Sequence, residues 1–177
     1  MPFGVTLCFD PLSASAIAKM WEVLATKRID TDRHQLGYAP HVTLAVYPDE
    51  TPAAQLTASL RELAATWHAL PVTLNALGIF PSSSAVFWAA PVVTPALLAR
   101  HAAVQTALPD LQTRAHYRLG AWVPHVTLSG AVDDPGAALS VLLSVWQPLE
   151  GLLDRLELVR FRPVQVLQSC KLPLASR

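Results

Sequence analysis

The chain has 177 residues, of which 52% are hydrophobic and 15% charged, and its 13 basic residues balance its 13 acidic ones. This composition excludes an intrinsically disordered chain, because soluble domains usually carry about 25% charged residues and disordered chains combine few apolar residues with high net charge. It also argues against binding to long DNA or RNA, since a chain without net charge has no long-range field that attracts a phosphate backbone.

The first half of the sequence alternates strand-like and helix-like patterns. Leu56, Leu60 and Leu63 recur at helical spacing behind Pro52, which suits a first helical turn. Short apolar runs bounded by turn residues predict strands. In chain order we expect a strand at Val5–Phe9, a helix at Pro11–Lys27, a strand at His41–Tyr47, a helix at Pro52–His68, and a strand pair at Pro71–Phe80 and Ala85–Val92 joined by a hairpin turn at Pro81–Ser84.

The second half begins with a helix, because Thr94 is a suitable N-cap and Pro95 suits the first helical position. The predicted order is a helix at Thr94–Leu108, a polar connection at Pro109–Leu119, a strand at His125–Ala131, a helix at Asp134–Trp146, and strands at Leu152–Phe161 and Val164–Leu172. The two halves together give about four helices and seven strands.

This order of elements predicts an α+β fold in a single domain, residues 1–177. We expect a bilobal, pseudo-duplicated architecture with one lobe at about residues 1–93 and the other at about 94–177. Each lobe would hold a small, mostly antiparallel sheet that faces a central cleft, with helices outside. Exchange of a strand between the lobes is left open.

One pentapeptide occurs twice in the chain. Residues 40–44 and 124–128 both read Pro-His-Val-Thr-Leu, so that His125 follows His41 by 84 residues, close to half the chain. An identical pair of this length arises by chance on the order of once in a hundred such chains. The repeat therefore supports a duplicated architecture.

Each copy places an imidazole beside a hydroxyl. Successive side chains of a strand point to opposite faces, so His41 and Thr43 share one face, and so do His125 and Thr127, while the apolar residues of each copy share the other. If a pseudo-twofold axis relates the lobes, two imidazoles and two hydroxyls converge in the cleft.

This set of side chains suits phosphodiester chemistry. An ordinary imidazole titrates near pH 6.5, so one histidine can act as a base while the other acts as an acid, and the sequence leaves open which is which. Threonine hydroxyls can bind the non-bridging phosphate oxygens, where charge accumulates. We expect no metal and no other cofactor, because neither histidine has Asp, Glu or Cys within two residues.

A strand with this sequence could also be purely structural. Val and Thr favour strands, and a half-buried histidine can be hydrogen-bonded within a core. For one copy alone that interpretation would be preferred. Core packing needs only apolar character at a repeated position, however, so the recurrence of both His and Thr favours a shared chemical task.

The paired His-x-Thr-Leu motif at His41 and His125 resembles that of the two-histidine phosphoesterase superfamily, which includes bacterial 2′-5′ RNA ligase and cyclic phosphodiesterase proteins. The resemblance covers most of the chain, including the strand–helix openings and the helix before the second motif. It implies that both motifs line a central cleft, with His41 and His125 as catalytic residues and Thr43 and Thr127 as phosphate-binding residues. It also implies substrates with a 2′,3′-cyclic phosphate or a 2′-5′ linkage.

Basic and aromatic residues near the motifs are weaker candidates for substrate binding. Arginines could contact phosphate, and tyrosine or histidine could stack on a base, although each could equally be a solvated loop residue. Large aromatics in strands are more often core residues. The candidates are Tyr38, Arg114, His116, Tyr117, Arg118, Trp88 and Trp122. Outside the motifs, we expect Arg114 or Arg118 to contact the substrate. His68 and His101 are expected on the surface of helices.

The sequence thus predicts a monomeric, metal-independent phosphoesterase that acts on a nucleotide or a short RNA with a cyclic phosphate or a 2′-5′ linkage, and not on DNA. The alternative is a non-catalytic module that binds a nucleotide or an RNA end in the same cleft. The two histidines argue against this alternative, because permanently charged Arg or Lys would bind phosphate better.

Two further expectations concern location and the cysteines. No apolar segment reaches the roughly 20 residues that span a bilayer, and the N-terminus lacks the basic region of a signal peptide, so we expect a cytoplasmic protein without membrane contact. Cys8 and Cys170 lack Cys-x-x-Cys spacing and are expected to be structural thiols in apolar surroundings.

Overall fold

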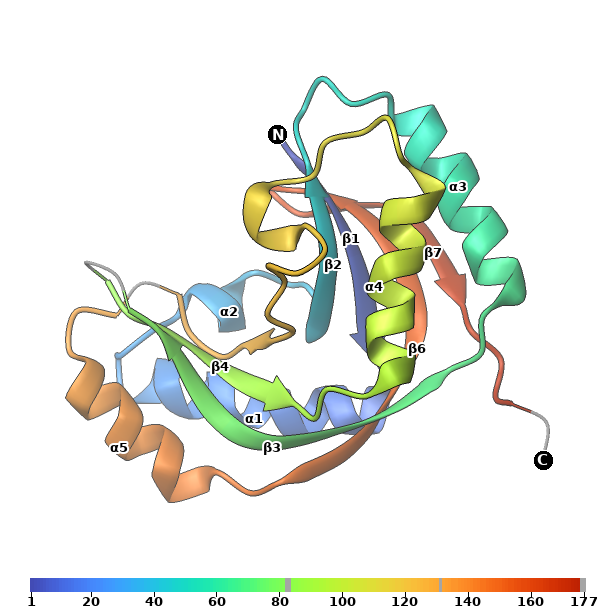
Figure 1. Cartoon of the computed structure of the whole chain (residues 1–177). Coiled ribbons are helices and arrows are strands. Elements are labelled where there is room, and N and C mark those ends of the chain that lie inside the picture. The colour runs from blue at the N-terminus through green and yellow to red at the C-terminus, as the bar shows by residue number, and fades with distance from the viewer. Residues whose placement is uncertain (82–83, 131, 176–177) are drawn as a thin grey trace.

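The computed structural model describes residues 1–81, 84–130 and 132–175 (Figure 1). These residues form seven strands and five α-helices, together with the segments that connect them. The α+β class expected from the sequence is confirmed. The elements in chain order are β1 (Phe3–Phe9), α1 (Pro11–Thr26), α2 (Asp32–Gln35), β2 (His41–Tyr47), α3 (Ala53–Thr66), β3 (Leu70–Phe80), β4 (Val86–Pro91), α4 (Pro95–Ala107), the short 3-10 helix η1 (Ala115–Tyr117), β5 (Val126–Thr127), α5 (Pro135–Val145), β6 (Leu149–Arg160) and β7 (Gln165–Lys171).

The strands form one antiparallel sheet in the order β2-β1-β6-β3-β4-β5, with β7 also paired to β6. The first residues of β6, 149–153, pair with β3, whereas its later residues pair with β1 and with β7. The two small sheets expected from the sequence are therefore two half-sheets that are continuous through β6. One half-sheet contains β2, β1, β7 and the end of β6, and the other contains β3, β4, β5 and the start of β6.

Both half-sheets combine segments that are far apart in the sequence. The C-terminal strands β6 and β7 lie beside the N-terminal strands β1 and β2, while β3 and β4 from the first half pair with β5 and β6 from the second half. The division of the chain near residue 93 falls between β4 and α4 and does not separate the half-sheets. The physical reason is that β6 is 12 residues long and forms hydrogen bonds in both half-sheets.

Two pairs of helices cover the sheet. Helix α1 packs on α5, β1 and β6, whereas α3 packs on α4, β6 and β7 and α4 also packs on β2. In Figure 1, α1 and α5 form one neighbouring pair of helices, and α3 and α4 form the other. Buried apolar side chains from these elements, including Phe3, Val5, Leu7 and Phe9 of β1, form one continuous core. Within the described residues, no helix is long and apolar enough to cross a membrane.

Strand β5 is much shorter than the sequence predicts. The expected strand spans His125–Ala131, but β5 pairs only over Val126–Thr127, and Ala131 lies outside the described residues. The ladder ends because the Ser129 hydroxyl accepts the N–H of Phe87 at 3.1 Å, while the N–H groups of Leu128 and Ser129 both donate to the Phe87 carbonyl. A side chain thus replaces the next backbone pair, and His125 precedes the paired residues.

One connection contains a helix that the sequence did not predict, and another lies partly outside the described residues. The connection before β2 contains the short helix α2, whose first N–H, that of Asp32, donates to the Asp30 carboxylate at 2.7 Å. Strands β3 and β4 pair antiparallel as far as Phe80 and Val86, as expected for a hairpin. Residues 82 and 83 of the predicted turn lie outside the described residues.

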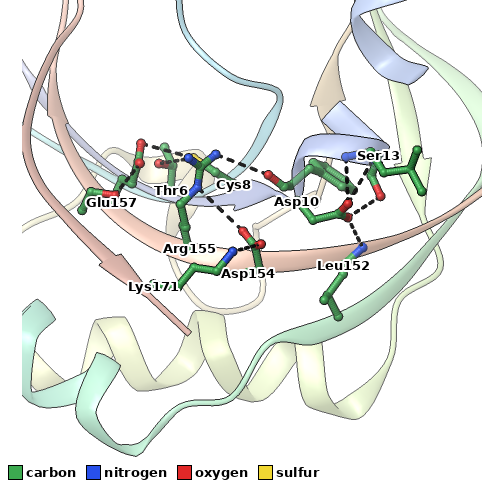
Figure 2. Close-up of polar contacts among 12 residues, drawn as sticks. Thr6, Cys8, Asp10, Ser13, Leu152, Asp154, Arg155, Glu157 and Lys171 are labelled. Atoms are coloured by element: carbon green, nitrogen blue, oxygen red, sulfur yellow. Dashed lines mark hydrogen bonds and ion pairs between the residues drawn. The ribbon is translucent and has the colours of Figure 1, made fainter. Parts of the chain in front are cut away.

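The Asp10 side chain joins the first helix to the sheet. Its carboxylate caps α1 by accepting the N–H groups of Leu12 and Ser13 at 3.0 and 3.2 Å, and it also accepts the N–H of Leu152 in β6 at 3.1 Å (Figure 2). Asp134 caps α5 in a simpler way, because its exposed carboxylate accepts the N–H of Ala137 at 3.0 Å. The Asp10 cap thus has the bond to the sheet, a second backbone N–H and the Ser13 hydroxyl beyond what the Asp134 cap has.

We therefore predict that Asp10→Ala lowers the free energy of unfolding by about 1 to 3 kcal/mol, because it removes an N-cap and leaves the N–H of Leu152 without its partner. Asp134→Ala is the matched control and should cost about 1 kcal/mol or less. Denaturant unfolding measures both values. Equal losses for the two variants would contradict a role of Asp10 beyond capping.

Candidate active site

The two motif strands lie at opposite ends of the strand order, yet β2 and β5 are in contact. The sheet therefore curves until its two ends meet. The segment before β5 strengthens this junction at Val46 of β2. The Thr113 hydroxyl bonds with both the N–H and the carbonyl of Val46 at 3.1 and 3.0 Å, and the N–H of Arg114 donates to the same carbonyl at 2.9 Å.

The four motif residues line one cavity at this junction. Its volume is about 200 Å³, and His41, Thr43, His125 and Thr127 all contribute to its wall. In both copies the His and Thr side chains are half-buried, while the residue after each of them is buried, as the strand alternation predicts. The structure thus brings together the two imidazoles and two hydroxyls of the repeated motif.

Both imidazoles are held by the same kind of bond. Nδ1 of His41 lies 2.8 Å from the carbonyl of Ala39, and Nδ1 of His125 lies 2.8 Å from the carbonyl of Val123. A carbonyl only accepts, so Nδ1 carries the proton in each neutral ring and Nε2 holds the free lone pair. Both histidines therefore have the tautomer in which Nε2 can accept a proton.

Burial makes both imidazoles harder to protonate. Desolvation lowers the pKa of His41 to about 4, and the nearby positive charges of Arg33 and of protonated His125 act in the same direction, against the bond to Ala39. Desolvation also lowers the pKa of His125, against its bond to Val123. Near neutral pH both rings are therefore uncharged before a ligand binds.

Two indoles fix the backbone of the motifs. Nε1 of Trp122 donates to the carbonyl of Thr43 at 3.0 Å, and Nε1 of Trp21 in α1 donates to the carbonyl of Thr127 at 3.1 Å. Trp122 lies two residues before Pro124, the first residue of the second motif, but it binds the first motif. Its polar atom thus joins the two motif segments, and the substrate-binding role expected from the sequence stays a prediction.

His101 is buried, whereas the sequence predicts a surface position. Its side chain is 2% exposed because α4 packs against β2, and its ring stacks on Trp122 with a centroid distance of 4.1 Å. Its Nε2 lies 2.7 Å from the carbonyl of Tyr117. His101 thus supports Trp122 from behind. His68 is exposed, as expected, but it lies beyond the end of α3 at Thr66 and not within a helix.

Four of the weaker candidates lie at the site. Tyr38 and Tyr117 line the cavity. His116 and Trp122 line an adjoining hollow, together with Tyr117 and His125. The hydroxyl of Tyr117 also interacts with Thr43. These four residues surround the two motifs, but only the two tyrosines share the cavity with all four motif side chains.

The other three candidates lie outside the cavity. Trp88 stacks on Phe80 and approaches His125 edge-on at 6.0 Å, so it forms a wall behind that imidazole. Arg114 and Arg118 are exposed and line neither the cavity nor the adjoining hollow. The reason is the turn of η1, which buries Tyr117 and leaves the arginines on both sides of it pointing to solvent.

A buried carboxylate under the first motif was not found from the sequence. Strand register places Thr43, Thr6, Glu157 and Ser169 side by side across β2, β1, β6 and β7, and Figure 2 shows Thr6 and Glu157 on the same face as Cys8. Glu157 is 5% exposed. It accepts the hydroxyls of Tyr38 at 2.9 Å and Ser169 at 2.7 Å.

This carboxylate supports His41 indirectly. The ring of Tyr38 packs against His41 with a centroid distance of 4.8 Å, and its hydroxyl also bonds with Thr6 at 2.7 Å. Cys8 lies in the same group and donates to Glu157, while burial raises the pKa of its thiol to about 12. A thiol that stays protonated is not a nucleophile, so Cys8 fits a structural role.

Two arginines also line the cavity, of which the sequence suggests Arg33 as a possible phosphate contact and gives no hint of Arg162. Arg33 comes from α2 and Arg162 from the connection between β6 and β7. Arg33 lies in a segment before the first motif that is rich in Arg, His and Tyr, which is a weak signal. Arg162 has no such signal, because it is 37 residues from the second motif and is brought to the cavity by the pairing of β6 with β1.

Comparisons with known proteins identify the family and the fold of this chain. The family model described as the 2′-5′ RNA ligase superfamily matches residues 9–164. Similar solved structures include TT0787 of Thermus thermophilus, with 17% identity, a TM-score of 0.69, and coverage of 99% of this chain and 100% of that chain. No curated protein matches the sequence significantly.

Two further structures share the fold. LigT of E. coli in its apo form has 16% identity and a TM-score of 0.64, with 97% of both chains covered. Usb1 of Kluyveromyces marxianus has 13% identity and a TM-score of 0.54, with 97% of this chain and 98% of that chain covered. The family match spans most of the sequence and contains both histidine motifs, and the chain therefore belongs to the 2′-5′ RNA ligase superfamily of two-histidine phosphoesterases.

Proposed function

We propose that the protein is a metal-independent phosphoesterase that uses His41 and His125 for acid–base catalysis on 2′,3′-cyclic phosphates or 2′-5′ phosphodiesters of nucleotides or short RNA. The observation that carries this proposal is the convergence of both imidazoles and both threonine hydroxyls on one cavity. Membership of the superfamily supports an enzyme of this class.

His41 acts as the base and His125 as the acid. Burial lowers the pKa of His41 to about 4, so its Nε2 is free to take a proton. The pKa of His125 is also lowered, but an anionic phosphodiester bound beside it favours the protonated ring. The threonine hydroxyls of Thr43 and Thr127 donate to the non-bridging oxygens as negative charge grows on them.

Hydrolysis of a 2′,3′-cyclic phosphate illustrates the steps. A water oxygen attacks phosphorus while the water proton passes to Nε2 of His41. The bond between phosphorus and one ribose oxygen breaks, and Nε2 of His125 protonates that oxygen. The product is a nucleotide with a phosphate monoester on one ribose hydroxyl and a free hydroxyl beside it.

Ligands seen in related structures support a nucleotide-sized substrate. LigT of E. coli has been solved with 3′-AMP, with phosphate and with NADP+, and Usb1 with uridine monophosphate. The cavity of about 200 Å³ and the zero net charge of this chain suit such small ligands better than a long RNA.

A purely binding role is less well supported. The permanent positive charge of this cavity lies on Arg33 and Arg162, whereas the two motif imidazoles are uncharged near neutral pH because burial lowers the pKa of each, and a module that only bound the phosphate would need no such pair. Uncharged imidazoles whose Nε2 atoms are free suit proton transfer. Acid–base catalysis therefore accounts for the pair better than anion binding does.

We predict that His41→Ala and His125→Ala each lower kcat by about 10²- to 10⁴-fold, because a general base or acid typically contributes that much. The losses should not multiply in the double variant, since both residues serve one transition state. Hydrolysis of 2′,3′-cyclic nucleotides and 2′-5′ dinucleotides measures the effect. Exposed His68→Ala is the control, and near-normal activity of either single motif variant, with an unchanged melting temperature, would remove that histidine from the mechanism.

The pH profile of kcat/KM should be bell-shaped with its maximum below pH 6.5. Activity is lost at low pH as His41 becomes protonated, near its pKa of about 4, and lost at high pH as His125 is deprotonated, at a pKa lowered from the ordinary 6.5. Steady-state rates of cyclic-nucleotide hydrolysis, measured between about pH 3.5 and 9, test whether the maximum of kcat/KM lies below pH 6.5. A maximum above pH 7 would contradict the assignment.

Activity should persist in the presence of EDTA. Within the described residues, no three His, Cys, Asp or Glu side chains lie close enough together to hold a metal ion. Cyclic nucleotide hydrolysis is measured with and without the chelator across the pH profile. Loss of activity that a divalent ion restores would replace acid–base catalysis by a metal mechanism.

A further inference from the structure

Two arginines stand at the mouth of the catalytic cavity, and the motif chemistry does not use them. Arg33 and Arg162 line the same cavity as the four motif residues. Both bind one carboxylate, Asp32. Arg33 donates to it through Nε and Nη2 at 2.9 and 2.6 Å, and Arg162 donates through Nη1 and through Nη2, the latter at 2.6 Å.

The arginines are held in place from two sides. Asp30, just before α2, accepts the N–H of Gly130, which follows the second motif, and also accepts the N–H of Asp32 at 2.7 Å. Asp32 then binds Arg162 in the connection between β6 and β7. The segment that carries Arg33 thus spans the mouth between the second motif and that connection, and the guanidinium groups are positioned before any ligand binds.

The two guanidinium groups line the cavity, whereas the carboxylates beside them, Asp32 and Asp30, do not. Hydrogen bonds from Arg162, with a further contribution from Arg33, hold the pKa of Asp32 at about 2, so this carboxylate stays ionised. Each guanidinium has more N–H donors than its bonds to Asp32 use. The side chain of Arg33 is 18% exposed and that of Arg162 is 50% exposed, so both can reach a ligand.

Among the described residues that line the cavity, these arginines are the only ones with a permanent charge. The imidazoles are uncharged near neutral pH because burial lowers the pKa of both. Leu36, Phe161 and Val164 add apolar surface to the wall of the same cavity. A sugar and base suit this apolar surface, and an anion suits the two guanidinium groups.

We propose that Arg33 and Arg162 form a second anion subsite, and that the preferred substrate is a nucleotide with a further phosphate, either at its 5′ position or in the linkage to the preceding nucleotide, besides the phosphate that reacts. This proposal rests on the proposed function, because it assigns the reacting phosphate to the His and Thr residues. The subsite selects the substrate and takes no part in proton transfer.

The test compares the binding of adenosine 2′,5′-bisphosphate and adenosine 2′-monophosphate by calorimetry. The wild type should bind the bisphosphate about tenfold or more tightly than the monophosphate, because a charge-assisted bond to phosphate contributes about one order of magnitude or more. Arg33→Met and Arg162→Met should each reduce this ratio several-fold and leave monophosphate affinity within about twofold of the wild type. Arg118→Met, an exposed arginine outside the cavity, is the matched control.

Arg33→Lys and Arg162→Lys keep the positive charge and serve as a check against misfolding. They should retain part of the preference for the bisphosphate because the charge remains, and lose the rest because lysine lacks the planar, two-pronged donor. Melting temperatures accompany each measurement. Equal wild-type affinity for the two ligands, or an equal loss of both affinities in the Met variants, would show that the arginines only pin the loop and would overturn the proposal.

Two additional measurements distinguish a 5′-phosphate from a linkage phosphate, and the second anion subsite from the proposed function. A dinucleotide with a terminal 2′-phosphate that binds as tightly as the bisphosphate assigns the subsite to an RNA linkage, and weaker binding assigns it to a 5′-phosphate. Binding needs no turnover, so an intact bisphosphate preference in a protein that hydrolyses nothing would contradict only the proposed function. Turnover of a cyclic monophosphate without any bisphosphate preference would contradict only the second subsite.

Discussion

The position of the two motifs relative to one another depends on the backbone hydrogen bonds of β6. This strand pairs with β1, which carries β2 and the first motif, and with β3, which leads through β4 to β5 and the second motif. The motifs therefore lie at the two free ends of one continuous sheet, and curvature brings these ends together. Nearly every residue of β1, the neighbour of β6, is apolar and buried, so the apolar core holds this curvature.

The junction of the two ends is closed by contacts between segments that are remote in sequence. Trp122 binds the carbonyl of Thr43, and Thr113 and Arg114 bind the backbone of Val46. An edge strand leaves N–H and carbonyl groups unpaired, and these contacts satisfy the N–H and carbonyl of Val46 and the carbonyl of Thr43. The same contacts hold the two motif segments in place relative to one another.

The two copies of the motif share their local support and differ in their surroundings. Each imidazole binds the carbonyl two residues earlier in the chain. His41 then packs on Tyr38, which the buried Glu157 holds, whereas His125 lies against the aromatic rings of Phe80 and Trp88. In the proposed mechanism, identical tautomers with different neighbours let the pair divide the roles of base and acid, because the environment sets each pKa. The proposed anion subsite keeps its positive charge on Arg33 and Arg162, and the charge of Arg33 lowers the pKa of His41 further.

The sequence by itself determined what depends on near neighbours in the chain. The alternation of side chains in a strand placed His41 with Thr43 on one face, and Thr94 and Asp134 cap their helices as local hydrogen-bonding rules require. The repeat and the α+β class followed from patterns of the same kind.

Only the tertiary structure decided the features that depend on distant segments. Arg162 reaches the cavity through the pairing of β6, and His101 is buried because α4 packs on β2. The lowered pKa of His41 has the same origin, since desolvation depends on which distant side chains cover a group, and no local pattern encodes that.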